Sequence, residues 1–485
     1  MNISLLDQTI VIVYFLGMIA IGASVASRIR SFDQFIIAGR QLSAPLLICT
    51  LVSTYYGLGV LLAGSEISYE SGVVNWFFDT APAYLAALFT GLVLTKKIRR
   101  HDVRSIPDII YAHYGLVPRI FTAAASFIYA LPAFSIIGIG GLFHALFGIP
   151  FEWGLIFGSI IALCYTLLGG LLAVALTDAV QFLLMASTLA IAAYLGLSQV
   201  GGIPEMQRLL PDHFEPTGGR PIALLFVYGL TSLSVLIEPA FYQRIFAART
   251  HRDVVIALSA GVVIWMSYDW VITMLGIGAH AAVEQGLMPA PEHLDQAVSQ
   301  FVLHVLPTGL KGLFAAGLMA AAMSTIDSYL LICASNIVYD IYQPLAKNKL
   351  NDRSLLLWTR VAMFFATIAT ILLCLYFSNV ERLWIFITAI LVCTALVPTI
   401  AAYYWPNVKR RAGQITTTVG FILVLIYYAW VDLLGVWDEE EIAYIWRGDL
   451  FGFSLTLNQD YGILYILPLV ILTFLIAQLT PGGKK

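Results

Sequence analysis

The sequence predicts an all-α polytopic membrane protein with about 13 transmembrane helices. Of its 485 residues, 60% are hydrophobic and only 11% are charged, whereas a soluble globular chain has roughly 25% charged residues. The mean hydropathy is +0.86. The charged residues gather between long apolar windows, and each window is long enough to cross a bilayer.

The expected spans follow one another along a single membrane domain over residues 1–485. The first span has no basic segment before it and no convincing cleavage site after it, so we interpret it as a retained helix and not a signal peptide. The spans are 8–27, 42–69, 73–95, 118–147, 152–169, 171–198, 221–246, 253–283, 308–341, 354–377, 382–405, 415–436 and 459–480.

The positions of Lys and Arg predict the orientation of these spans. An odd number of spans puts the termini on opposite sides, and cytoplasmic loops carry an excess of positive charge. With the N-terminus outside and the C-terminus in the cytoplasm, most of the 26 Lys and Arg are cytoplasmic. We therefore expect a multi-pass protein of a cell membrane, and a bacterial inner membrane fits so compact a chain. The Lys and Arg left outside are Arg208, Arg220, Lys311, Arg382 and Arg447.

Several classes of function are not expected from this sequence. The five cysteines all fall in apolar spans and lack metal-ligand spacing, and the eight histidines form no zinc motif. No nucleotide-binding loop is present, so the chain itself is not expected to hydrolyse ATP. We see no nucleophile–base pair, and we expect neither an enzyme nor a nucleic-acid partner.

Two spans are interrupted by polar and small residues, and they lie five spans apart. Such breaks in corresponding positions of two halves point to a binding site near the bilayer midplane, between inverted five-helix repeats. The repeats would cover 42–198 and 221–405, with an extra N-terminal segment at 8–40 and C-terminal helices at 415–480. Span 42–69 carries Ser53, Thr54, Gly57 and Gly59, and span 221–246 carries Thr231, Ser232, Ser234, Glu238 and Pro239.

Span 308–341 carries a dense group of oxygen-bearing side chains. Ser324, Asp327 and Ser328 share one helical face, and Thr325 lies beside them. The Ala321 carbonyl has a lone pair to spare even inside a helix. Hydroxyls, carbonyls and carboxylates suit a hard cation, so we expect an ion site here. The alternative is that Ser and Thr only bond back to their own helix.

Five carboxylates lie inside the expected spans, and no Lys or Arg lies near mid-depth to pair with them. Asp178 would either bind a cation or contact water at the cytoplasmic end of its span. Asp79 and Asp269 would either face a substrate cavity or satisfy neighbouring backbone groups. Glu238 is expected to cap the backbone freed by the following proline. Asp327 belongs to the group in span 308–341.

Taken together, these features resemble the sodium:solute symporter family, which includes bacterial sodium/proline, sodium/galactose and sodium/sialic acid symporters. The resemblance covers nearly the whole chain and implies 13 or more helices, an external N-terminus and a LeuT-type core of two inverted five-helix repeats with broken helices. Its carriers are Ala-Ala-Met-Ser-Thr-x-x-Ser at 321–328, Gly-Gly-x-x-Ala-Val-x-x-Thr-Asp at 169–178, Phe241–Arg249 and Ser71-Gly72.

The resemblance implies a central sodium site and a second cation site. The central site would use the backbones of Ser53, Tyr56 and Ala321 with the side chains of Ser324 and Thr325. The second site would use Asp178 with Ser324, Asp327 and Ser328. Asp327 stands where the family has a hydroxyl, so two carboxylates would either strengthen a second cation site or hold a proton. The residues leave one or two sodium ions open.

Substrate-facing positions are also implied by the resemblance. The arginine that holds a carboxylate in the sialic acid branch has no counterpart, since the basic residue of span 118–147, Arg119, lies at its cytoplasmic end. An acidic cavity favours a neutral, zwitterionic or cationic solute, such as an amino acid or an amine. The implied positions are Tyr55, Val60, Phe78, Asp79, Thr231, Ser234 and Asp269.

The sequence thus predicts sodium-coupled secondary active symport of a small organic solute by alternating access. The chain would work as a single copy in the lipid bilayer, with sodium and the solute as its partners. Two alternatives stay open. One is a proton-coupled transporter of the same fold, in which Asp178 or Asp327 titrates. The other is a membrane sensor of the solute.

Overall fold

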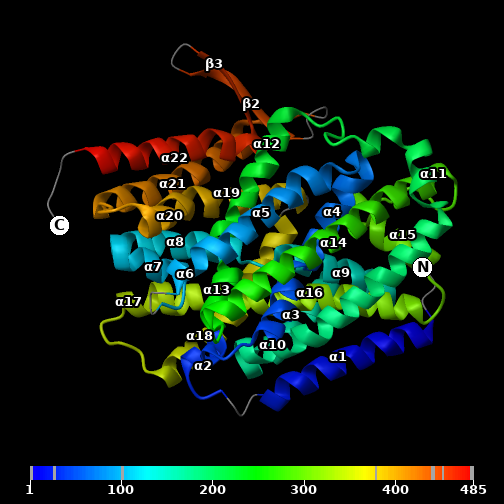
Figure 1. Ribbon diagram of the computed structural model, residues 1–485, viewed down its shortest axis with the longest axis horizontal. Coiled ribbons are helices and arrows are strands. Elements are labelled where there is room, and N and C mark those ends of the chain that lie inside the picture. The colour runs from blue at the N-terminus through cyan, green and yellow to red at the C-terminus, as the bar shows by residue number, and fades with distance from the viewer. Residues whose placement is uncertain are drawn as a thin grey trace.

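The computed structural model describes residues 4–25, 29–99, 103–376, 380–438, 443–450 and 453–480. The fold is a bundle of long helices, with one small sheet projecting beyond them (Figure 1). Within the described ranges, 11 helices are long and apolar enough to cross a membrane. A bent pair, Ala44–Tyr55 with Leu58–Ser71, raises this to 12, and the helix Phe151–Cys164 is apolar but shorter.

The first part of the chain runs from the N-terminal helix to the long helix α10 and the segment after it. Its helices are α1 (Leu5–Val25), α2 (Phe32–Ile37), η2 (Ala38–Arg40), α3 (Ala44–Tyr55), α4 (Leu58–Ser71), η3 (Asn75–Thr80), α5 (Ala81–Phe89), η4 (Thr90–Leu94), α6 (Thr95–Ile98), α7 (Ile106–Tyr114), α8 (Leu116–Tyr129), α9 (Ala133–Phe147), α10 (Phe151–Gln199), α11 (Gly202–Leu209) and η5 (Pro211–Phe214).

The second part contains the remaining helices and the sheet. Its elements are α12 (Ile222–Thr231), η6 (Ser232–Ile237), α13 (Pro239–Ala247), α14 (His251–Glu284), η7 (Leu294–Gln296), α15 (Ala297–Val305), α16 (Leu310–Ser335), η8 (Asn336–Tyr342), α17 (Gln343–Leu345), α18 (Asp352–Tyr376), α19 (Val380–Leu391), η9 (Val392–Leu396), α20 (Val397–Tyr404), α21 (Arg410–Leu434), β1 (Val436–Asp438), β2 (Ala443–Leu450), β3 (Phe453–Asn458), η10 (Gln459–Tyr461) and α22 (Gly462–Leu479).

The two interruptions predicted from sequence are present. α3 and α4 meet at an angle of 52° around Tyr56 and Gly57. In the second broken span, Glu238 takes an extended conformation between η6 and α13, and Pro239 occupies the first turn of α13, where a missing N–H does no harm. Both breaks leave backbone groups outside a helical ladder, and such groups are tolerated only where protein buries them or a cavity adjoins them.

Helix α10 contains the expected boundary between spans 152–169 and 171–198. Gly170 has φ +54° and ψ −155°, so the 49-residue helix changes direction there. A Cβ at this position would meet the carbonyl oxygen of Phe35 at 2.5 Å. Glycine is therefore required twice, by its backbone conformation and by the close approach of α2.

Helix α16 lies in the centre of the bundle and contacts α10, α1, α18 and α9. In the apolar window of the span 310–345, 89% of the residues are buried. A helix that is apolar on every side belongs in such a position. The polar group on α16 is thus enclosed by protein and does not face lipid.

The three-stranded antiparallel sheet β1–β2–β3 precedes the last helix. β2 and β3 project beyond α21 and α22 (Figure 1). β2 pairs with β3 from Ile445–Asn458 to Leu450–Phe453, and its Tyr444, Ile445 and Trp446 have high strand propensity. The all-α prediction did not include this sheet.

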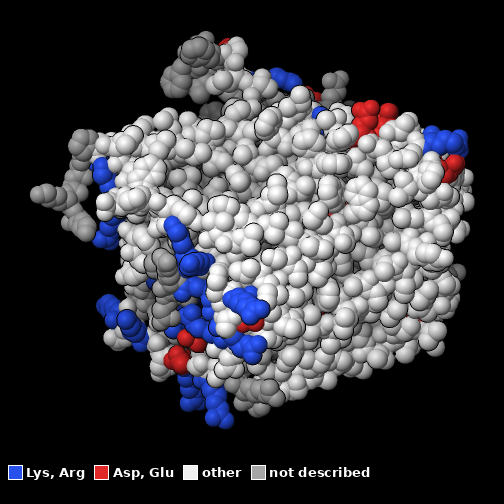
Figure 2. Space-filling model, viewed as in Figure 1, with Lys and Arg blue, Asp and Glu red and all other residues white. Residues whose placement is uncertain are grey.

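Charge is distributed unevenly over the face of the molecule that Figure 2 shows. Lys and Arg gather at the lower left of the face in Figure 2, at the end where Figure 1 places α2, α13 and α17. Figure 2 also shows a wide band of uncharged side chains beside this cluster. This pattern agrees with the positive-inside argument, while the orientation itself stays a prediction.

Candidate functional site

A cavity of about 140 Å³ lies beside both helix breaks. Helices α3, α4, α5, α9, α14, α16 and α19 contribute to its wall. Three hydroxyl residues come from the second broken span, Thr231 from α12 and Ser232 and Ser234 from η6. Because the cavity lies where two broken helices meet, it is the candidate solute site. The predicted substrate positions that line it are Tyr55, Val60, Thr231, Ser234 and Asp269.

The other two predicted substrate positions are placed differently. Phe78 is not part of the cavity lining, and it packs against the apolar cluster of Ile67, Val74, Leu225 and Tyr228. The backbone of Asp79 belongs to η3, but its side chain lies outside the described part of the structure. Sequence reasoning missed other lining residues, which include Thr80, Tyr84, Tyr129, Tyr329 and Trp384.

Asp269 is the charged residue among the described residues that line the cavity, and no described lining residue is Lys or Arg. It comes from the middle of α14 and is 3% exposed. Its carboxyl group is a hydrogen-bond partner of the Tyr56 hydroxyl. A single carboxylate in a mostly apolar and aromatic cavity favours a solute with an amino or ammonium group.

The predicted ion-binding hydroxyls of α16 meet the broken end of α3. Ser324 Oγ donates to the carbonyl of Ser53 at 2.8 Å, and Thr325 Oγ1 donates to the carbonyl of Thr54 at 3.1 Å. Both hydroxyls also reach the Ala321 carbonyl, at 3.1 and 3.2 Å. We call these five residues the junction. The two hydroxyls thus contact the carbonyls of α3, where an ion site is predicted, and they also bond back to their own helix, as the alternative predicts.

Two neighbours of the break explain how the junction is held. Tyr56 ends α3 and directs its hydroxyl to the carbonyl of Trp265, at 3.0 Å. Gly57 begins α4, and a Cβ there would meet Thr325 Oγ1 at 1.9 Å. Glycine therefore lets the backbone of the break approach α16 more closely than any other residue would allow.

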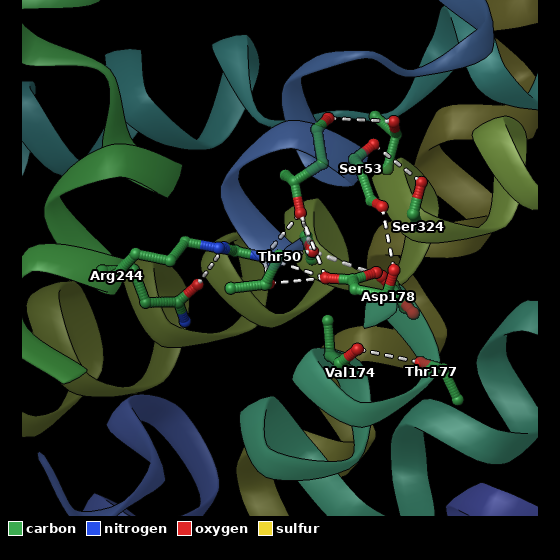
Figure 3. A network of polar contacts seen from close by, with 12 residues as sticks. Thr50, Ser53, Val174, Thr177, Asp178, Arg244 and Ser324 are labelled. Carbon is green, nitrogen blue, oxygen red and sulfur yellow. Dashed lines mark hydrogen bonds and ion pairs between the residues drawn. The ribbon is translucent and has the colours of Figure 1, made fainter. Parts of the chain in front are cut away.

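Next to the junction lies a second polar cluster, which we define as Thr50, Thr54, Asp178, Asp327 and Ser328. Figure 3 labels Thr50 and Asp178 of this cluster, beside Ser53 and Ser324 of the junction. Asp178 Oδ2 accepts from Thr50 at 2.5 Å and from Thr54 at 3.5 Å. Thr54 and Ser328 are 2.9 Å apart, and Ser328 donates to Asp327 Oδ1 at 3.3 Å. The predicted second-site residues Asp178, Asp327 and Ser328 are thus brought together.

Both carboxylates of the second cluster are fully buried. The alternative in which Asp178 contacts water at a helix end therefore does not hold for this conformation. Ser53 links the cluster to the junction, because its hydroxyl donates to the Asp178 carbonyl at 3.0 Å while its own carbonyl accepts from Ser324. The two polar groups are therefore joined through one residue of α3.

Arg244 of α13 enters the second cluster (Figure 3), and this overturns the expectation that no Lys or Arg lies near these carboxylates. The side chain is 1% exposed, and its Nη2 lies 3.9 Å from Asp178 Oδ2. Nη2 also donates to Thr50, Thr54 and Ser328, at 3.2, 2.7 and 2.6 Å. Sequence position suggested a cytoplasmic residue near a helix end, but a long side chain can carry its charge inward.

Glu238 has the role that its sequence predicts. Its Oε2 accepts from the N–H of Ala240 at 3.1 Å, which caps α13 after the proline break. Its Oε1 accepts from the hydroxyl of Tyr329 at 2.6 Å. Tyr329 lines the cavity, so the cap also fixes a cavity wall residue.

The chain is similar to known proteins over most of its length. The sequence profile of the sodium:solute symporter family matches residues 35–420. The osmoregulated proline transporter OpuE of Bacillus subtilis (strain 168) is 25% identical, over 75% of this chain and 76% of its own length. The sodium/pantothenate symporter of Escherichia coli (strain K12) is 25% identical over 81% and 84%. A sodium/proline symporter of Staphylococcus aureus is 23% identical over 97% and 92%.

Two solved structures show the same kind of fold. One is a Na⁺-coupled sialic acid symporter in a substrate-bound, outward-open state. Its superposition covers 100% of this chain and 99% of the symporter chain, with a TM-score of 0.83 and 17% identity. The other is MHP1, a nucleobase-cation-symport-1 family transporter. Its superposition covers 91% of this chain and 94% of the MHP1 chain, with a TM-score of 0.55 and 10% identity.

Proposed function

Because the chain belongs to the sodium:solute symporter family, we propose that it couples sodium entry at the junction to the uptake of a small solute with an amino group. The observation that carries the proposal is the pair of α16 hydroxyls, 2.8 and 3.1 Å from two carbonyls of the broken helix. The cavity with its single described carboxylate, Asp269, adjoins these groups through Thr54 and Thr325.

The oxygen atoms of the junction can become available to a cation while each hydroxyl keeps one hydrogen bond. Ser324 and Thr325 each have a second acceptor, the Ala321 carbonyl. When their O–H groups turn to that carbonyl, the hydroxyl oxygens and the carbonyls of Ser53 and Thr54 all face the space between the helices. Oxygen atoms of this kind are the ligands that a hard cation needs.

Sodium bound between α3 and α16 would order the break that forms one wall of the cavity. The ion then raises the affinity for solute, and the solute raises the affinity for the ion by the same factor. A tenfold sodium gradient supplies about 1.4 kcal/mol per ion, and a potential of 100 mV adds roughly 2.3 kcal/mol. Together they support roughly a 500-fold accumulation of solute per ion.

The two helix breaks also support a proposal about the arrangement of the repeats. We assign α3 and α4 to the first of two inverted repeats and α12, η6 and α13 to the second, with the N-terminus outside. Solute specificity is proposed from the cavity alone, since the three relatives described above are named for proline and for pantothenate. Asp269 would hold an ammonium group, and Thr231 and Ser234 would bond polar groups of the solute.

Thermal unfolding in sodium against potassium, at equal ionic strength, tests the ion site. At a sodium concentration 100 times its dissociation constant, binding raises stability by about 2.7 kcal/mol. We expect the Ser324→Ala, Thr325→Ala double variant to lose this rise, and Ser335→Ala, a hydroxyl elsewhere on α16, to keep it. If wild type shows no sodium-specific rise, sodium coupling fails and proton coupling through the second cluster becomes the better explanation.

A further inference from the structure

Two histidines and a backbone carbonyl meet on the side of the bundle that the proposed orientation places outside. His280 lies near the end of α14, His213 lies in η5, and Tyr69 lies near the end of α4. His280 Nδ1 and His213 Nε2 are 3.0 Å apart, and they lie 2.8 and 2.9 Å from the carbonyl oxygen of Tyr69. We call these three atoms the outer triangle. The His280 side chain is 24% exposed, so ions in solution can reach it.

The Tyr69 carbonyl does not take its usual partner in the helix. A carbonyl in an α-helix accepts from the N–H four residues later, which here belongs to Val73. That N–H donates instead to the carbonyl of His213, at 2.8 Å. Carbonyl oxygens at the C-terminus of a helix carry partial negative charge. The Tyr69 carbonyl therefore offers its lone pairs to the two histidines or to a cation.

Protons alone cannot satisfy the outer triangle. Each imidazole nitrogen carries either a hydrogen or a lone pair, and the carbonyl oxygen has only lone pairs. If both nitrogens carry hydrogens, two donors face each other at 3.0 Å. If one nitrogen or neither carries a hydrogen, a ring lone pair faces the carbonyl oxygen at 2.8 or 2.9 Å. In every protonation state, at least one of the three contacts therefore joins two like groups.

A divalent transition metal would satisfy all three contacts at once, because the two nitrogens and the oxygen would each direct a lone pair at the ion. Ligands about 2.0–2.1 Å from zinc, at angles of about 90–109°, lie roughly 2.9–3.4 Å apart. The edges of the outer triangle are close to these lengths. Imidazole ligands favour zinc, copper or nickel over magnesium and calcium, which prefer oxygen.

The surroundings of His280 suit a metal ligand. Metal-binding histidines direct their second ring nitrogen at a carboxylate, a carbonyl or water. His280 Nε2 lies 3.9 Å from Glu284 Oε1, one turn further along α14. The Tyr69 ring stacks on the His280 ring, with centroids 4.6 Å apart and an interplanar angle of 12°. The imidazole is thus oriented with one nitrogen toward the outer triangle and the other toward a carboxylate.

We propose that the outer triangle binds one zinc ion, held by His213 Nε2, His280 Nδ1 and the Tyr69 carbonyl, with water completing its coordination. The ion would tie η5 to the ends of α4 and α14. Because α4 belongs to the first broken span and η5 belongs to the connection that leads to the second, zinc would link the two proposed repeats on this side. The site is separate from the junction, and its test needs neither sodium nor solute.

Calorimetric titration of ZnCl₂ into the purified full-length protein in lipid nanodiscs, without histidine tags and after chelator treatment, tests the site. Wild type should bind one zinc ion per chain and should unfold at a higher temperature in zinc than in chelator. His213→Gln and His280→Gln should each abolish both effects. Glu284→Gln should weaken zinc binding about 10- to 100-fold. His144→Gln, which changes an α9 histidine whose Nδ1 contacts the Ile149 carbonyl, should bind zinc as wild type does.

The wild-type titration alone can overturn the proposal, so the test does not depend on the folding of any variant. No saturable zinc binding in wild type would show that the two histidines share only protons. Zinc binding of wild-type strength in both histidine variants would place the ion elsewhere on the chain. Displacement of zinc by an excess of MgCl₂ would also refute the site, because Mg²⁺ prefers oxygen ligands and would not compete for imidazole.

Discussion

Gly57→Ala is the sharpest single test of the junction. The backbone of Gly57 has φ −66° and ψ 167°, which alanine adopts freely, so the substitution introduces no backbone strain. Its new Cβ would lie 1.9 Å from Thr325 Oγ1 and 2.9 Å from Thr325 Cβ. Carbon atoms in contact are about 3.5–4.0 Å apart. Rotation of the threonine can move its oxygen, but only a displacement of α4 or α16 can separate the two Cβ atoms.

The size of the effect follows from this overlap. An extra methyl group in a well-packed region costs about 1–3 kcal/mol. If that strain falls on the ion-bound arrangement, in which the carbonyls of α3 must face the hydroxyls of α16, sodium affinity falls roughly 5- to 150-fold. The apparent dissociation constant for ²²Na⁺, or the sodium concentration that gives half the thermal stabilisation, measures this change.

Gly229→Ala provides a matched control. Gly229 lies in α12, just before the other break, and a Cβ there meets nothing within 4 Å. We expect its sodium affinity to equal that of wild type. If Gly57→Ala also binds sodium with wild-type affinity, the close contact between the break and α16 has no part in ion binding, and the junction is not the sodium site.

Three further predictions concern the cavity and its surroundings. Asp269→Asn should abolish uptake of amino-group solutes and keep the sodium-dependent thermal shift; loss of both would instead indicate a structural role. Glu238→Ala should lower stability by about 1–3 kcal/mol for each buried donor left unpaired, whereas Tyr329→Phe, which leaves the helix cap in place, should lower it less in the same unfolding assay. Burial lowers the pKa of His213 in η5, and nearby His280 lowers it further. The unfolded chain then binds more protons below about pH 6.5, so stability should fall from pH 7.5 to 5.5, and His213→Gln should reduce that fall.

Local sequence patterns predicted the features that are local in space. The breaks at Gly57 and at Glu238–Pro239 follow from a glycine, which weakens a helix, and a proline, which cannot continue one. The hydroxyls of α16 share a face because helical geometry requires it. The residues that contact α16 were harder to predict. The resemblance implied the backbone of Tyr56, whereas the Thr325 hydroxyl donates to the carbonyl of Thr54. Contacts between carbonyls of one helix and hydroxyls of another depend on how the helices cross, which residue type does not report.

Arg244 shows why charge pairing was missed. In sequence it lies among cytoplasmic residues near a helix end, and the positive-inside rule counts it there. Its position in space depends on the break at Glu238, which starts α13 at a depth from which its side chain reaches Asp178. An energetic argument could have found it, because carboxylates inside the bundle need a positive partner. Of the two broken spans, 42–69 has no Lys or Arg, and 221–246 has Arg244.

Ser53 connects three helices at the first break. Its hydroxyl donates to the backbone carbonyl of Asp178 on α10, and its own carbonyl accepts from Ser324 on α16. A sodium ion at the proposed junction would bind the Ser53 carbonyl while the Ser53 hydroxyl still holds α10. Ion binding would therefore fix the broken end of α3 against both α10 and α16. That broken end contributes Thr54 and Tyr55 to the cavity wall, so the ion would order one wall of the cavity that the solute enters.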